Sequence, residues 1–411
     1  MRLLPTETTP DAGVLLTTRG MRAFVDGLVS VVLAPYLVLL GFDGVHVGAI
    51  VAGTLFGSAA LTLFVGLRGQ RVPRLLLLQL VAVVMILTGL GFGFFSSFWA
   101  LFAVAVVGTL NPSAGDVSVF LPTEQALLPS TVSDRQRTAL YGRYSLVGFT
   151  VAAFGSLAAG VPNWLHRHGW VDAIPAYRGV FLVYALTGVA VLLSYRRLSP
   201  AIDAGASSRQ AVSAHTRRIV VRLAALFCVD AFGGGFVVQS LLALWLFRRF
   251  GLSVGVAGAI FFWAGLLSGL SALAAVRIAR RIGLVRTMVF THLPANALLI
   301  ATPFMPNVGL AVACLLARSA LSQMDVPART SYVMAIVPPA ERAAAASITN
   351  VPRSLASVLP PLAAGWMLDH SRFGWPLVIG GLLKAAYDLL LLRQFGEIRP
   401  PEEMPAVVVP R

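Results

Sequence analysis

Long apolar stretches alternate with short polar segments along almost the entire chain. Twelve stretches are close to or above the roughly 20 residues that a helix needs to cross about 30 Å of hydrocarbon. Charged residues, prolines and glycines bound them, at positions 20–41, 45–66, 74–95, 98–121, 138–161, 176–195, 219–247, 252–276, 285–304, 308–333, 343–367 and 374–393. The pattern predicts an all-α membrane protein with twelve transmembrane helices.

The longest polar interruption lies almost at the middle of the chain. It runs over residues 196–218 and includes Ala201-Ile-Asp-Ala-Gly-Ala-Ser-Ser208, a composition typical of flexible linkers. We therefore expect an N-terminal six-helix half over residues 1–195, a linker over 196–218, a C-terminal six-helix half over 219–393 and a tail over 394–411.

The two halves resemble each other in sequence. At a shift of 205 residues, the segment 122–160 aligns without gaps on 327–365, so that Arg137 meets Arg342. Near the start of each half, Val25-Asp26 matches Val229-Asp230. Similarity at a fixed shift indicates a duplication. Two pseudo-symmetric halves of this kind are typical of transporters whose substrate site lies between the repeats, near the membrane midplane.

Composition and charge support a membrane protein. Of the 411 residues, 57% are hydrophobic and 12% charged, and the formal net charge is +15. The basic residues fall mainly between the apolar stretches, and most lie on the side that would hold both termini. Since cytoplasmic loops are enriched in Lys and Arg, we expect a multi-pass protein of the plasma membrane with both termini cytoplasmic. The sequence has no stripe of basic and aromatic residues, so we expect no nucleic-acid partner.

A loop motif identifies a family resemblance. The segment after the second helix reads Gly66-Leu-Arg-Gly-Gln-Arg71-Val-Pro-Arg74, and Arg281-Ile-Gly283 is its remnant in the second half. With twelve spans, a 6+6 repeat and a central loop, the chain resembles the major facilitator superfamily, whose motif is G-x-x-x-D-R-x-G-R. Here glutamine replaces the acid and proline the second glycine. The resemblance implies two lobes that rock against each other and expose a central site alternately to each side.

Two carboxylates occupy equivalent positions in the first and seventh helices, which line the cavity in this family. A charge at the bilayer centre costs at least about 2.5 to 3.5 kcal/mol, so Asp26 and Asp230 require a reason to be there. A buried carboxylate can take up and release a proton, which makes both residues candidates for proton coupling. Arg22, one turn before Asp26, offers a simple ion pair as the alternative, whereas Asp230 lies beside the flexible Gly233-Gly-Gly235.

Candidate substrate contacts lie deep in the second half. Arg318 and Arg353 fall about ten residues into the tenth and eleventh helices, where each must face protein, water or a counter-ion. The planar guanidinium can bind an anionic substrate, or it can hold Asp230 in a structural ion pair. We include Asn350, just before Arg353, and Gln239 of the seventh helix as polar substrate contacts.

The repeat also predicts a gate. The shift of 205 residues brings Glu124 of the fourth helix opposite Arg329 of the tenth, so a salt bridge between them would close the cytoplasmic mouth. Asp325, one turn before Arg329, competes as its partner. In the last helix, Lys384 and Asp388 are one turn apart and are expected to neutralise each other.

No motif indicates an enzyme, a metal site or a cofactor. The chain has no glycine-rich phosphate loop with lysine, no H-E-x-x-H and no nucleophile elbow. We therefore predict a secondary transporter of a small molecule in the lipid bilayer, and proton-coupled efflux by antiport is the preferred mode. The alternatives are an importer or uniporter of a small organic anion, and a non-transporting membrane sensor or scaffold.

Overall fold

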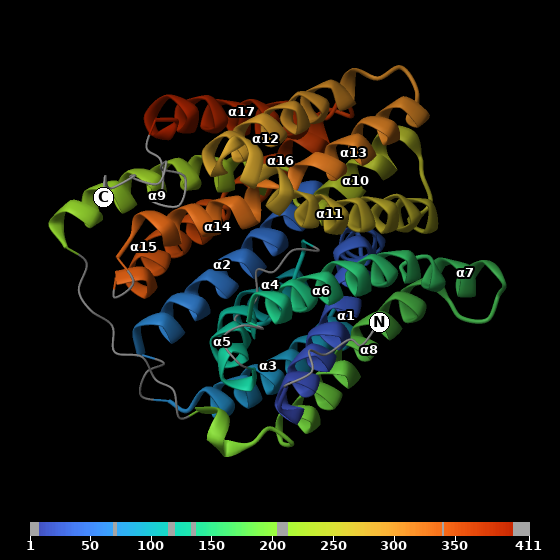
Figure 1. Ribbon diagram of the computed structural model, residues 1–411. Coiled ribbons are helices and arrows are strands. Elements are labelled where there is room, and N and C mark those ends of the chain that lie inside the picture. Colours follow the sequence, from blue (N-terminus) through green and yellow to red (C-terminus); the bar gives the residue numbers. More distant parts are fainter. Residues whose placement is uncertain are drawn as a thin grey trace, which may run out of the picture.

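A computed structural model of the chain describes residues 8–68, 72–113, 120–132, 137–203, 213–338 and 341–397. Apart from one isolated bridge between Thr8 and Val132, the regular structure of these residues is helical. Helices α1 to α8 form the N-terminal half, in the lower part of Figure 1, and α9 to α17 form the C-terminal half above it. The predicted all-α, two-lobed fold is confirmed.

The N-terminal half contains α1 (Pro10–Leu39), α2 (Gly44–Arg68), α3 (Arg74–Phe94), α4 (Phe98–Val107), α5 (Phe120–Leu127), α6 (Arg137–Ala158), α7 (Val161–Arg167) and α8 (Ala173–Tyr195), with the short helices η2 (Leu128–Thr131) and η4 (Pro200–Asp203). The C-terminal half contains α9 (Ala214–Gly235), α10 (Gln239–Phe250), α11 (Val254–Ile282), α12 (Leu284–Ala301), η5 (Thr302–Phe304), α13 (Val308–Ser322), α14 (Asp325–Ile336), α15 (Arg342–Ala356), α16 (Pro360–His370) and α17 (Trp375–Phe395). The predicted linker and tail lie partly outside the described residues.

The number of spans is less regular than the sequence pattern suggests. Within the described residues, ten stretches are long and apolar enough to cross a membrane. The other two predicted spans, the fourth and the eleventh, are divided into α4 and α5 and into α15 and α16. The seventh and tenth are also interrupted, between α9 and α10 and between α13 and α14. Irregular backbone at membrane depth is tolerated where protein covers it or where it lines a cavity, so we expect these breaks to face the interior of the protein.

The first helix begins earlier than predicted. We expected it from residue 20, but α1 starts at Pro10, which occupies the first helical turn together with Asp11. The hydropathy pattern excluded residues 10–19 because they contain Asp11 and Arg19. Arg19 and Arg22, one turn later, are both buried in the structure, with 6% and 2% of their surface exposed, and they face partners inside the half.

Glycines bring the two halves into close contact. Helix α2 packs on α16, and α6 packs on α11. A Cβ atom on Gly44 would lie 2.6 Å from the carbonyl oxygen of Gly365, and one on Gly48 would lie 2.4 Å from that of Pro361. Small residues at such crossings allow backbones to approach closely. We call this the far side, and the opposite side, where α1 and α9 begin, the linker side.

A carboxylate fastens the halves together on the far side. Asp369, near the end of α16, accepts hydrogen bonds from the backbone N–H groups of Gly44 (2.8 Å) and Val45 (2.9 Å) at the start of α2. The same carboxylate pairs with Arg248 of α10, at 2.6 Å. A negative charge at a helix N-terminus is also favoured by the helix dipole. The structure is therefore closed on its far side, with Asp369 as a latch.

We expect Asp369→Asn to loosen this closure by about 1 kcal/mol, or about fivefold in the population open to the far side. The measurement is the labelling rate of Ser30→Cys, a buried position between the halves, in a Cys228→Ser, Cys314→Ser background. A membrane-impermeant maleimide is applied to the far side of oriented proteoliposomes. Asp43→Asn is the control, because Asp43 also caps α2 but does not contact the other half. Equal labelling rates in both variants would contradict the latch.

Candidate functional site

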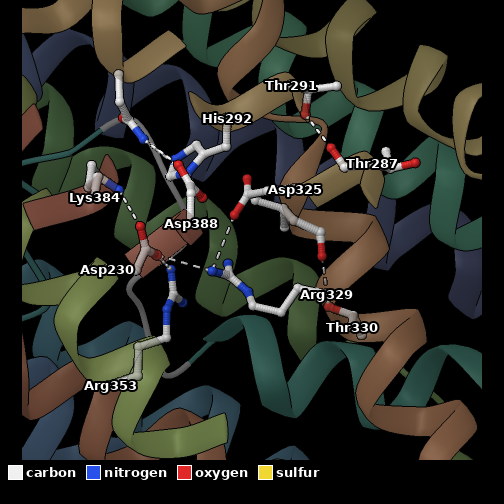
Figure 2. Close-up of polar contacts among 12 residues, drawn as sticks. Asp230, Thr287, Thr291, His292, Asp325, Arg329, Thr330, Arg353, Lys384 and Asp388 are labelled. Carbon is white, nitrogen blue, oxygen red and sulfur yellow. Dashed lines mark hydrogen bonds and ion pairs between the residues drawn. The ribbon is translucent and has the colours of Figure 1, made fainter. Parts of the chain in front are cut away.

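A buried carboxylate in the C-terminal half is surrounded by cations from three helices. Asp230 of α9 is 2% exposed. Its Oδ1 lies 2.5 Å from Nζ of Lys384 on α17, and its Oδ2 lies 3.1 Å from Nη1 of Arg329 on α14. Arg353 of α15 is more distant, at 3.8 Å from Oδ2 (Figure 2). Asp230 thus links α9 through charge to three other helices, and a carboxylate removed from water in this way requires such partners.

Local sequence explains how α9 reaches its partners. The glycines after Asp230 remove side-chain bulk where α9 crosses its neighbours. A Cβ atom on Gly233 would lie 2.9 Å from the carbonyl oxygen of Gly380 on α17, and one on Gly235 would lie 2.7 Å from that of Ser357. The close crossing of α9 and α17 is what brings Lys384 within reach of Asp230.

The cluster around Asp230 carries more positive than negative charge. Arg329 also pairs with Asp325, at 3.3 Å, so the predicted competition from Asp325 is present. Arg318 of α13 interacts electrostatically with both aspartates. Among the described residues, the buried Nε atoms of Arg318 and Arg353 have no hydrogen-bond partner. We define the Asp230 cluster as two carboxylates and four cations: Asp230, Asp325, Arg318, Arg329, Arg353 and Lys384.

A second buried pair lies next to this cluster. Nδ1 of His292 on α12 lies 2.9 and 3.1 Å from the two carboxylate oxygens of Asp388 on α17. Asn296, one turn after His292, donates to the same carboxylate at 2.9 Å. The sequence predicted that Lys384 and Asp388 would neutralise each other, but their direct partners are Asp230 and His292. The sequence analysis missed His292, although polar residues one turn apart in an apolar stretch, His292 and Asn296, were a visible signal.

The N-terminal half has its own charge cluster, centred on Glu124 of α5. This fully buried carboxylate accepts hydrogen bonds from Thr18 (3.0 Å) and Tyr195 (2.5 Å) through Oε1. Its Oε2 binds Arg22 and Tyr144. The cluster joins α1, α5, α6 and α8, and so ties four helices of one half together.

The predicted gate pair is not formed in this structure. Glu124 and Arg329, both among the described residues, each bind an opposite charge within their own half, Arg22 in one case and Asp230 in the other. Each of these pairs lies within one half, whereas Glu124 and Arg329 belong to different halves. The two pairs occupy equivalent places with reversed polarity: the acid is on the fourth span in the first half and on the seventh in the second. A Glu124–Arg329 bridge remains a prediction for a conformation closed on the linker side.

The remaining predicted coupling and substrate residues are dispersed. Asp26 is 9% exposed and interacts electrostatically with Arg22, at the edge of the Glu124 cluster and in the opposite half from Asp230. Gln239 donates to Ser30 (2.9 Å) and to Ser156 (3.3 Å), and therefore bridges the halves. Asn350 is exposed on α15, the helix that carries Arg353.

The loop motif lies at the linker side. Gly66 is in the last turns of α2, Arg71 lies outside the described residues, and Arg74 donates to the carbonyl oxygen of Ala126 at 3.3 Å. In the second half Arg281 is exposed, and Gly283 has a φ of 87°, which favours glycine between α11 and α12. The motif therefore marks the turns between successive helices.

Comparisons with known proteins agree with this architecture. The family model of the Major Facilitator Superfamily matches residues 15–322. An uncharacterized membrane protein of Saccharomyces cerevisiae is 23% identical over 420 residues, which cover 94% of each chain.

Solved transporter structures share the fold at low identity. A bacterial homolog of the human lysosomal transporter Spinster, inward-facing and occupied, has a TM-score of 0.71 at 17% identity and covers 95% of this chain and 98% of its own. A D-xylose-proton symporter has a TM-score of 0.71 at 14% identity, covering 93% and 97%. The human organic anion transporter MFSD10 has a TM-score of 0.64 at 15% identity, covering 93% and 100%. The chain belongs to the Major Facilitator Superfamily and is a multi-pass membrane protein built as a transporter.

Proposed function

We propose that this protein is a secondary transporter that carries a small organic anion by alternating access. The observation that carries the proposal is the surplus of positive charge in the Asp230 cluster, where four cations face two carboxylates. Buried cations without full compensation are unstable unless an anion joins them. An anionic substrate would supply the missing charge while it is bound.

Arg353 and Arg318 are the residues best suited to hold the anion. Arg353 makes the longest of the three ion pairs with Asp230, and its side chain is 36% exposed. Arg318 is half-buried on α13, and its interactions with the aspartates are electrostatic. Their planar guanidinium groups can bind a carboxylate or phosphate through two parallel hydrogen bonds. The exposed amide of Asn350 would contact an uncharged part of the substrate from the same helix as Arg353, whereas Gln239 would act at the seam between the halves.

Proton-coupled efflux by antiport is the second candidate. It is favoured by the position of Asp230, because a proton and a cationic substrate would compete for this one buried carboxylate. Substrate and proton would then alternate on one cluster, as antiport requires. Asp26 would serve the same role in the N-terminal half beside Arg22. No observation favours the sensor or scaffold alternative.

We place the protein in the plasma membrane with both termini cytoplasmic. Arginines gather on the linker side, where Arg196, Arg197 and Arg218 lie in or near the connection between the halves. The positive-inside rule assigns that side to the cytoplasm. The latched far side would then face the outside.

The anion proposal predicts that Arg353→Gln and Arg318→Gln each lower kcat/KM for an anionic substrate about tenfold or more, because a charge-assisted hydrogen bond is lost. The measurement is uptake into proteoliposomes from a panel of labelled mono- and dicarboxylates, phosphate esters, and cationic and neutral compounds. Arg372→Gln is the matched control, since this exposed arginine lies in a far-side loop. Transport confined to cationic compounds, or unchanged in both variants, would refute the anion site.

The antiport proposal predicts that a proton gradient accelerates wild-type transport and that Asp230→Asn abolishes the acceleration. The asparagine side chain has the same shape but cannot exchange a proton. Gradient-independent exchange of substrate should persist in the variant. The measurement is initial uptake with and without a pH difference across the proteoliposome membrane, and Asp43→Asn provides the control at an exposed loop. A gradient response retained in Asp230→Asn would remove Asp230 from the coupling step.

A further inference from the structure

The buried His292–Asp388 pair has no role in the substrate site described above. Three features distinguish it: a titratable imidazole, a carboxylate, and a position one helical turn from a cation of the Asp230 cluster. His292 and Asp388 are 4% and 0% exposed, and Asn296 beside them is also fully buried. A buried polar pair of this kind either stabilises the fold or binds a small ligand such as a proton.

We propose that His292 and Asp388 form a proton-binding site, and that its protonation decides whether Lys384 pairs with Asp230 or with Asp388. The inference deepens the proposed function, on which its meaning for transport rests. The proton site itself is defined by the geometry around Asp388.

The hydrogen bonds determine which atom takes the proton. Asn296 donates to Asp388 through Nδ2, and Nδ1 of His292 lies 2.9 Å from the same carboxylate. An ionised carboxylate can only accept, so beside it the neutral imidazole carries its hydrogen on Nδ1. The second proton is therefore taken by Nε2. A histidine oriented by a carboxylate on Nδ1 can exchange a proton at Nε2.

Charged and titratable groups surround this pair on several helices. The edge-on ring of Tyr387 lies 6.2 Å from the His292 ring, measured between centroids. Asp230 of α9 interacts electrostatically with both His292 and Asp388, and Lys384 of α17 interacts with Asp388. The other members of the Asp230 cluster, Arg318 of α13, Asp325 and Arg329 of α14, and Arg353 of α15, lie beyond Asp230. Figure 2 shows Asp388 and Lys384 on one helix, directed toward His292 and Asp230 respectively.

The charge balance connects the two sites. With His292 doubly protonated, the imidazolium neutralises Asp388, and Lys384 remains with Asp230, at 2.5 Å as observed. With His292 neutral, Asp388 is a carboxylate one helical turn from Lys384, a spacing at which opposite charges attract. Asp230 keeps Arg329 and Arg353, so Lys384 can change partners without leaving a carboxylate alone. Loss of the proton at His292 would thus loosen the contact between α17 and α9.

The chain offers a direct probe of this exchange, because Lys384 is its single lysine. Selective ¹⁵N-lysine labelling therefore reports one side-chain ammonium group by NMR, in the full-length protein in nanodiscs and without substrate. We expect the Nζ chemical shift to change in one step as the pH is varied and the His292–Asp388 site exchanges its proton. His292→Gln and Asp388→Asn should each remove the step. His46→Gln should keep it, since His46 pairs with the exposed Asp43 on the far side.

The outcomes separate this inference from the proposed function. A pH-independent Nζ shift in the wild-type protein, or a step retained in both His292→Gln and Asp388→Asn, would overturn the proton site. If one variant fails to give monodisperse protein, the other decides the question. Since no substrate is present, the result does not depend on anion transport. A protein that keeps the step but transports no anion would leave the proton site standing and remove the proposed function.

Discussion

The free-energy cost of placing charge inside a bilayer determines how the polar side chains of this structure are paired. Asp230 and Glu124 are both fully or almost fully buried, and each is matched by cations or donors from its own half. An ion pair that is complete within one half is not broken when that half moves against the other. The two clusters therefore give each lobe a rigid interior. The contacts between lobes rely instead on glycine packing, on the far-side carboxylate of Asp369, and on the hydrogen bonds of Gln239 to Ser30 and Ser156.

Much of the fold follows from the sequence because the bilayer restricts the chain so strongly. Apolar runs of helix length, the central polar segment and the repeat at a shift of 205 residues predict two six-helix halves, and the family match confirms the fold. The predicted start of α1 was wrong because hydropathy treats Arg19 as solvent-facing, while the fold buries it. The breaks in the fourth, seventh, tenth and eleventh spans were also missed, since a short interruption barely changes an average over a whole span.

The site was harder to predict, because spacing along a helix reveals only local partners. The sequence singled out Asp230, Arg318, Arg329 and Arg353 by their depth in apolar runs, and the structure brings them together. It could not show that Lys384 crosses to α9 instead of pairing with Asp388, since that choice depends on how closely Gly233 and Gly380 pack. His292 was overlooked because one polar residue barely changes the average hydropathy of its span.

The presence of one lysine among so many arginines has a chemical consequence. Arginine stays protonated and binds in a fixed planar geometry, whereas an ammonium group on a flexible stem can turn from one partner to another. Lys384, the single lysine of the chain, is buried, with 8% of its surface exposed. Amine-directed reagents therefore have no lysine to modify in any loop of this protein, and cross-linking or surface attachment must use introduced cysteines or lysines instead.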